Sequence, residues 1–389
     1  MRLAATFAVA LTLLLPAGGA ASGQRVLGID STVLGMQLAW YDPVTLAKLP
    51  GRTVSLANHD ASWSFSPDGT RLVLGSEGAA HLRFVDVRHM RTTGNLALRS
   101  GPPGAVTWLR ANRLLATGRK AVSVVDPQGL RVVRRTMLPG VVDGDAARLP
   151  DGLALPLGQD VNGFAPAKVA VVDAEGHVRS VTLDRISIGL YHADGQYEVR
   201  RPGFAVDPAT RRAFVVGSDY TIAEVDLRSL VVSYHGGASR SLAKVLPGPV
   251  RNARWLGNGL LAVGGIDSIR RDGLRIVDTR DWSTRAVDAE SVDLTLADGV
   301  LVGSAPFVPP DIAVFGMDGV LRYRFELQTG ERFNVFGRYG YVCRGENLSR
   351  IVELATGSTL RAIESEGLKG PACVTLLYGR SSDTRLSPE

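Results

Sequence analysis

One short pattern recurs along this chain: an apolar strand that ends in Asp and runs into a turn. Six clear copies read LAWYDP (38–43), LRFVDV (82–87), VSVVDP (122–127), VAVVDA (169–174), IAEVDL (222–227) and LRIVDT (274–279). Two degenerate copies follow as IAVFGM (312–317) and RIVELA (350–355). Copies at intervals of about 37 to 53 residues, each with several short strands, are typical of a β-propeller. The repeat therefore predicts an all-β fold, a single propeller built of four-stranded blades.

The two ends of the repeat complement each other. Three strands are expected within residues 25–56 before the first complete unit, and one orphan strand, ACVTLLYG (372–379), follows the last unit. The orphan strand can supply the missing first strand, which would close the ring and remove two exposed sheet edges. This arrangement predicts eight blades. Seven is the alternative if one of the looser units, 292–327 or 333–364, is not a blade.

The first residues have the composition of a secretory signal peptide. A short basic start is followed by an apolar run over residues 3–15 and by the small residues AGGAAS at 17–22. That run is too short to cross a bilayer, and no later stretch reaches the ~18 apolar residues that a span needs. We expect residues 1–22 to be removed, 23–380 to form the propeller and 381–389 to be a flexible tail. The mature chain is expected to be exported, periplasmic or extracellular, without a membrane span.

The charge balance argues against a nucleic-acid partner. Lys and Arg total 44 against 38 for Asp and Glu, so the formal net charge is +6. The basic residues are nearly all Arg, a bias typical of a GC-rich bacterial genome. They are scattered singly or in pairs, without the aromatic-interleaved basic stripe that nucleic-acid binding favours. We expect a monomer that does not bind nucleic acid.

The repeat unit resembles a known family. Residues 204–237 (FAVDPATRRAFVVGSDYTIAEVDLRSLVVSYHGG) and the segments FSPDGTRLVLGS and LRFVDV within 65–87 are similar to repeats of the YVTN/WD-repeat-like bacterial β-propeller family. The resemblance covers essentially the whole mature chain and implies the propeller fold, but its motifs are structural. We therefore expect the blade aspartates to accept hydrogen bonds from turn amides rather than to bind a ligand; they are Asp42, Asp86, Asp126, Asp173, Asp226 and Asp278.

The connections between strands are unequal at the two ends of the ring. First-to-second and third-to-fourth turns share one face and are short. Second-to-third connections and the links between blades share the other, which we call the long-loop face. The long segments there are 31–36, 159–166, 184–202, 236–249, 266–272 and 305–310. Long loops on a rigid scaffold are where binding residues usually lie.

The candidate binding residues lie on that face. The segments 159–166, 184–202 and 266–272 carry aromatic, basic and acidic side chains, a mixture typical of binding hot spots. The candidates are Asp160, Asn162, Phe164, Tyr191, His192, Tyr197, Arg200, Arg201, Asp267, Arg270 and Arg271. His192 beside carboxylates would suit a general base or a metal ligand, but we favour the simpler explanation that such residues solvate a long loop.

No motif assigns a reaction. The six His residues are dispersed, and neither H-x-x-x-H, H-E-x-x-H, G-x-S-x-G nor a phosphate-binding glycine loop occurs. We therefore expect no metal, no cofactor and no catalytic residue. The preferred interpretation is a binding or scaffold module for an unknown protein, glycan or small molecule. The alternative is a hydrolase or lyase similar to the propeller lactonases, with its site at the axial funnel.

The only two cysteines are Cys343 and Cys373. Two thiols in an exported protein favour a disulfide, which here would join the last blade to the closing strand. Two small buried hydrophobic residues are the alternative.

Overall fold

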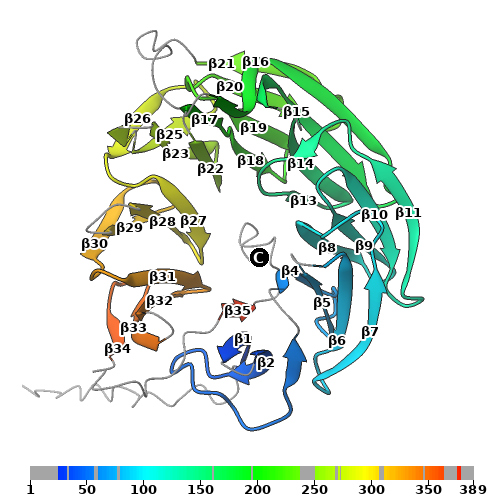
Figure 1. Ribbon diagram of the computed structural model, residues 1–389. Helices are drawn as coiled ribbons and strands as arrows, with labels where there is room; N and C mark the ends of the chain where they lie inside the picture. The colour runs from blue at the N-terminus through cyan, green and yellow to red at the C-terminus, as the bar shows by residue number, and fades with distance from the viewer. Residues whose placement is uncertain are drawn as a thin grey trace, which may run out of the picture.

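The computed structural model describes residues 25–32, 35–56, 60–76, 79–159, 162–193, 196–236, 250–267, 270–271, 273–305, 311–344, 347–362 and 375–377. Within these ranges every regular element is a β-strand, and the strands form eight sheets arranged in a ring (Figure 1). The eight-bladed propeller is confirmed. The described part of the chain contains no helix that could cross a membrane.

The first half of the ring contains blades 1 to 4. Blade 1 consists of β35 (Thr375–Leu377), β1 (Val26–Thr32), β2 (Gly35–Tyr41) and β3 (Val54–Leu56). Blade 2 consists of β4 (Asp60–Phe65), β5 (Arg71–Ser76), β6 (His81–Asp86) and β7 (Arg91–Ala97). Blade 3 consists of β8 (Ala105–Arg110), β9 (Arg113–Thr117), β10 (Ala121–Asp126) and β11 (Arg131–Met137). Blade 4 consists of β12 (Val141–Val142), β13 (Ala147–Leu149), β14 (Gly152–Gly158), β15 (Gly163–Asp173), β16 (Val178–Ala193) and β17 (Gln196–Arg200).

The second half contains blades 5 to 8. Blade 5 consists of β18 (Gly203–Asp207), β19 (Arg212–Val216), β20 (Ile222–Asp226) and β21 (Val232–His235). Blade 6 consists of β22 (Val250–Gly257), β23 (Leu260–Asp267), β24 (Arg270–Arg271), β25 (Leu274–Asp278) and β26 (Thr284–Asp288). Blade 7 consists of β27 (Asp293–Ala297), β28 (Val300–Ala305), β29 (Asp311–Gly316) and β30 (Leu321–Glu326). Blade 8 consists of β31 (Glu331–Phe336), β32 (Tyr339–Arg344), β33 (Asn347–Glu353) and β34 (Thr359–Ala362).

The ring closes through blade 1, as the complementary ends predict. β35 pairs antiparallel with β1, with Gly28 opposite Leu376, and it takes the innermost position that the first strand has in the other blades (Figure 1). The last described strand and the first therefore share one sheet. This closure leaves no open edge between the two ends of the repeat.

The blade aspartates have the structural role that the sequence predicts. Asp126 Oδ1 accepts hydrogen bonds from the amides of Gln128 (3.0 Å) and Gly129 (3.1 Å) in the turn after β10. Turn amides donate in the same way to the other five, Asp42, Asp86, Asp173, Asp226 and Asp278. These side chains fold the turns by offering the backbone a local acceptor.

The same turns place a bulky residue in the left-handed backbone region. Four residues after the aspartate, φ is positive at Leu46, Met90, Leu130, Leu230 and Trp282. Such a conformation costs about 1–3 kcal/mol for a residue other than glycine. The cost is offset by packing on the preceding blade. For example, a Cβ added to Gly94 of blade 2 would lie 2.3 Å from Leu130 Cδ1 of blade 3.

The core lies between the blades rather than at one centre. Each hydrophobic cluster joins neighbouring sheets, as where Phe84 of blade 2 meets Trp108 of blade 3 edge to face with ring centroids 6.2 Å apart. Both side chains are almost fully buried. Because each blade covers its neighbours, stability depends on the whole ring.

Several segments expected to be long loops are instead strand extensions. Segment 31–36 is largely paired, with Thr32 opposite Gly35. Segment 266–272 is a hairpin with Asp267 opposite Arg270, and segment 184–202 also folds as a hairpin. On the opposite face, the 42–53 connection between β2 and β3 is long, contrary to the uniformly short turns expected there. Residues 237–249 and 306–310 lie outside the described residues.

Candidate binding site on the blade 4 hairpin

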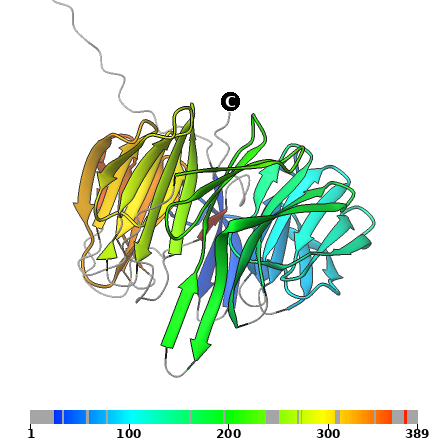
Figure 2. The ribbon, with the colours of Figure 1, turned by 90° about the horizontal axis from the view of Figure 1, so that it is seen from above.

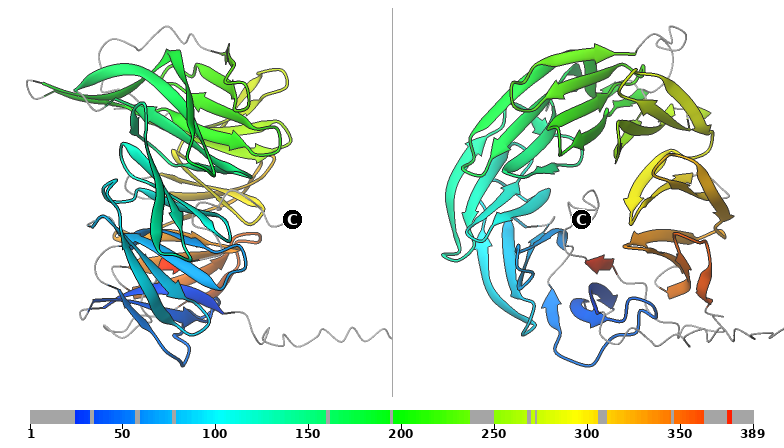
Figure 3. Two further views of the ribbon diagram at one scale, coloured as in Figure 1. Left: turned by 90° about the vertical axis from the view of Figure 1, so that its right-hand side faces the viewer. Right: turned by 180° about the vertical axis from the view of Figure 1, so that it is seen from behind.

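Blade 4 differs from the other blades because its outer strands continue past the ring. β16 is 16 residues long and pairs with β17 beyond the end of the ordinary blade. Figures 2 and 3 show this hairpin projecting along the ring axis from one face of the molecule. It is the long-loop face, since β16 begins at the short turn 174–177 and runs away from it.

A bulge redirects β16 toward the hairpin. Ala167 lies opposite Leu183 and Pro166 lies opposite Ser187, so residues 184–186 have no register partner on β15. Proline cannot donate a ladder hydrogen bond, and a strand with extra residues bends at that point. Ile186, 2% exposed, belongs to the core cluster between blades 4 and 5 and fixes the base of the hairpin.

Two side chains meet across a glycine on one face of the hairpin. Gly189 lies opposite Phe164 on β15 and opposite Arg200 on β17, so the three residues form one row across the sheet. The Arg200 Cζ atom lies 4.0 Å from the centroid of the Phe164 ring. Because Gly189 has no side chain, the guanidinium can cross the central strand and cover the ring.

Glycine is also required at this position by the backbone. Its φ is +141°, and a Cβ there would lie 2.2 Å from the Gly163 carbonyl oxygen. The Arg200 guanidinium is held further by Nη1, which donates a hydrogen bond to Ser187 Oγ at 3.1 Å. The site is therefore held in place by its own sheet.

Exposed apolar surface adjoins this cluster. The Tyr191 ring lies 6.5 Å from the Phe164 ring, centroid to centroid, at an angle of 35°. Tyr191 is 38% exposed, and Leu190 on the other face of the strand is 42% exposed. Aromatic and Arg side chains that are held in place and open to solvent are the residues that most often dominate protein interfaces.

Arg201 lies apart from the hairpin cluster. Its Nε atom is 3.0 Å from Asp143 Oδ1, and its carbonyl oxygen accepts the Arg251 amide at 2.8 Å. These contacts tie the end of the hairpin to the link between β12 and β13 and to the innermost strand of blade 6. Arg201 thus has a structural partner in addition to the binding role that the sequence suggests.

The remaining predicted residues are only partly placed. Asn162 is exposed, and its backbone bridges to Leu190 at the foot of the hairpin. Asp160 and the side chains of His192, Tyr197, Asp267, Arg270 and Arg271 lie outside the described residues. Their binding roles stay predictions.

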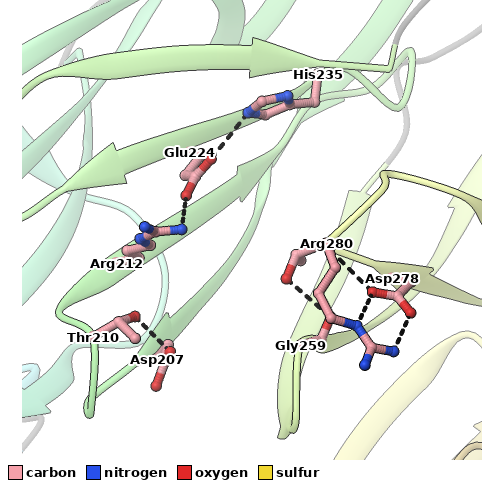
Figure 4. A network of polar contacts seen from close by, with 9 residues as sticks. Asp207, Thr210, Arg212, Glu224, His235, Gly259, Asp278 and Arg280 are labelled. Atoms are coloured by element: carbon pink, nitrogen blue, oxygen red, sulfur yellow. Dashed lines mark hydrogen bonds and ion pairs between the residues drawn. The ribbon is translucent and has the colours of Figure 1, made fainter.

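Three of the described histidines each pair with a single carboxylate. His89 lies 2.8 Å from Asp86 and His177 lies 2.9 Å from Asp173, both at turns of the short-turn face. His235 bonds Glu224 at 3.0 Å, and Glu224 also bonds Arg212 (Figure 4). Among the described residues no group of three or more His, Cys, Asp or Glu side chains is placed to hold a metal ion.

Sequence reasoning missed two residues of the site. Ser187 and Gly189 carry no recognisable motif, although the alternation of 186–191 before the dipeptide Asp194-Gly195 is a hairpin signature. That signature predicts two paired strands where a long loop was expected. It would also have placed Arg200 opposite the strand that carries Tyr191.

The comparisons with known proteins bear on the fold. No protein-family model matches the chain and no curated protein sequence matches it, so membership of the YVTN/WD-repeat-like family is not confirmed. The dihydro-heme d1 dehydrogenase NirN in complex with DHE is similar in structure, with a TM-score of 0.56 and 11% identity over 92% of this chain and 74% of that one. Apo AztD from Citrobacter koseri is similar with a TM-score of 0.56 and 13% identity, over 92% of this chain and 98% of that one. BamB from Moraxella catarrhalis is similar with a TM-score of 0.50 and 10% identity, over 81% of this chain and 92% of that one. At these identities the likeness shows the fold alone.

Proposed function

We propose that this protein is an exported, non-enzymatic β-propeller that binds a partner protein on its long-loop face, with the blade 4 hairpin as the principal contact. The observation that carries the proposal is the projection of the hairpin, which displays Tyr191 beside the Arg200–Phe164 pair and Leu190 on the other face of the strand. Exposed apolar side chains on a projecting pair of strands do not stabilise a monomer, and such surface often marks an interaction site. Export rests on the sequence of residues 1–22.

The hairpin also meets the physical needs of a binding element. Arg200 is held on Phe164 and by Ser187, so little side-chain entropy is lost when a partner packs against it. Tyr191 has few rotatable bonds and offers both an apolar ring and a hydroxyl. A positively charged group beside two aromatic rings favours a partner surface that combines apolar and acidic residues.

The register of the hairpin allows it to be shortened cleanly. The pair Gly189–Arg200 lies four positions below the closing pair Ala193–Gln196, so both have the same hydrogen-bonding type. Replacing residues 190–199 with Asn-Gly therefore joins Gly189 to Arg200 through a favoured two-residue turn. Ile186 and Ile188, which are buried in the blade, stay in place.

The test is affinity capture from an extract of the source organism, with proteins quantified by mass spectrometry. The shortened variant and the double variant Leu190→Ser/Tyr191→Ser should lose the partner that the unaltered protein captures. The matched control is Val133→Ser/Met137→Ser, which changes two apolar residues that are 51% and 58% exposed on β11. Retention by the shortened variant, or loss in the β11 control, would contradict the proposal.

The alternative function, a lactonase-like hydrolase, predicts a different metal content of the purified protein. Such a site would need carboxylates and a histidine around a divalent metal at the funnel. Elemental analysis of the exported protein separates the two functions: the binding module should contain no stoichiometric metal. One tightly held divalent ion per chain would favour the enzyme.

A further inference from the structure

A cleft of about 430 Å³ lies between blades 7 and 8. Its apolar walls include Val302 and Ile312 of blade 7 and Phe333 of blade 8, with Leu327 from the link between them. For comparison, the space lined by Phe204, Ala253 and Trp255 near the inner strands of blades 5 and 6 amounts to only about 10 Å³.

At the cleft, blade 7 differs from blades 2, 3 and 5 at one register position. Thr295 of β27 lies opposite Val302, and the residues at the same register position in blades 2, 3 and 5 are Ser64, Thr107 and Ala205. Those three are 2%, 0% and 3% exposed, because the next blade covers them. Thr295 is exposed and lines the cleft instead. Blade 8 thus leaves open the space that the following blade fills next to blades 2, 3 and 5.

The chemistry of the lining defines what would fit. Thr295, Ser304 and Asn334 add polar groups to the apolar walls, and no described residue that lines the cleft is charged. The hydroxyls of Thr295 and Ser304 have no hydrogen-bond partner within the described part of the chain. A concave site of this size, in which polar groups lie beside apolar walls, is a usual form of a small-molecule site.

We propose that the cleft between blades 7 and 8 binds a small, uncharged molecule that carries both apolar and hydrogen-bonding groups. An ionised ligand would lose its hydration without gaining an opposite charge in the cleft, which is strongly unfavourable. This site is separate from the blade 4 hairpin, and its occupancy does not depend on the partner proposed there.

The test uses a neutral fluorescent probe, N-phenyl-1-naphthylamine, and its anionic relative 1-anilinonaphthalene-8-sulfonate. The unaltered protein should bind the neutral probe at one saturable site, about tenfold or more tightly than the anion. This preference is informative because the net charge of +6 would favour the anion on general electrostatic grounds. Absence of saturable binding, or preference for the anion, would overturn the proposal.

Two substitutions at one position tie binding to the cleft. Thr295→Phe should fill the cleft and weaken binding of the neutral probe about tenfold or more. Thr295→Asp should weaken the binding as well, because it adds a charge to the cleft without adding bulk. The matched control Thr284→Phe changes an exposed threonine on β26, outside the cleft. Thermal melts show whether each variant is folded. If Thr295→Phe does not fold, the result with Thr295→Asp decides the test. Probe binding unchanged in a folded Thr295 variant, or equally weakened in the control, would overturn the proposal. The variant Leu190→Ser/Tyr191→Ser should bind the probe normally.

Discussion

Leu377 lies directly opposite Leu27 in the antiparallel pairing of β35 with β1. The two side chains are 1% and 2% exposed, and both belong to the cluster that packs blade 1 against blade 2. A three-residue strand thus joins the last described residues to the first and to the core of the next blade. Ring closure depends on burial as well as on backbone pairing.

Leu377→Ala should therefore destabilise the entire ring, by about 2–5 kcal/mol, because it removes buried methyl groups and leaves a cavity. Urea unfolding should show one transition at a lower midpoint. The control is Leu360→Ala on β34, a residue that is 44% exposed, which should change the free energy of unfolding by about 0.5 kcal/mol or less. A chain truncated before residue 371 should resemble Leu377→Ala. If both Leu377→Ala and the truncated chain unfold at the same urea midpoint as the unaltered protein, closure through β35 is refuted.

The blade aspartates should make stability fall in acid. Hydrogen bonds from the Ser229 and Arg228 amides hold the pKa of Asp226 below its usual range, and bonds from Arg280 lower the pKa of Asp278 to about 2. A carboxyl with a lowered pKa in the folded state stabilises above its unfolded pKa of about 4, and this contribution is lost as pH falls through the folded pKa.

Asp226→Asn keeps a turn acceptor but removes the titrating charge. Its melting temperature should lie below that of the unaltered protein at pH 7, and the difference should shrink as the pH falls toward 2. Melting curves across that range measure this convergence. A gap that widens in acid would show that Asp226 does not contribute through its ionised form.

His235 links blade 5 to a strained turn of blade 6. Its ring stacks on Trp282 with centroids 3.5 Å apart, while Nε2 lies 3.0 Å from Glu224. His235→Phe should lose the hydrogen bond and keep the stacking, and His235→Ala should lose both. We expect losses of about 1 kcal/mol and about 2 kcal/mol in the free energy of unfolding. Equal losses in the two variants would mean that the stacking contributes nothing.

Cys343 is 1% exposed, and its predicted partner Cys373 lies outside the described residues. We expect a disulfide between them in the exported protein. Thiol titration after denaturation without reductant should find no free thiol, and two after reduction. Two free thiols before reduction would leave closure to β35 alone.

The fold was predictable because its signals are local and repeated. The apolar strand that ends in Asp126 and the turn after it recur in blade after blade, so each copy supports the others. The pairing of β35 followed from a missing strand at one end and an extra strand at the other.

The site was less predictable because it depends on register and on departures from the repeat. Phe164, Tyr191 and Arg200 were all candidates, but only the bulge after Pro166 and the gap at Gly189 bring them together. The exposure of Thr295 depends on the position of blade 8 relative to blade 7, which no single strand sequence encodes.

The most direct test of the proposed binding face is site-specific photocrosslinking in the organism that makes the protein. A benzophenone amino acid is placed at Tyr191, 38% exposed on the hairpin, or at Val231, 61% exposed in a turn of the opposite face. We expect one discrete partner adduct from position 191 and none from position 231. An adduct from 231 alone, or no adduct from 191, would contradict binding through the long-loop face.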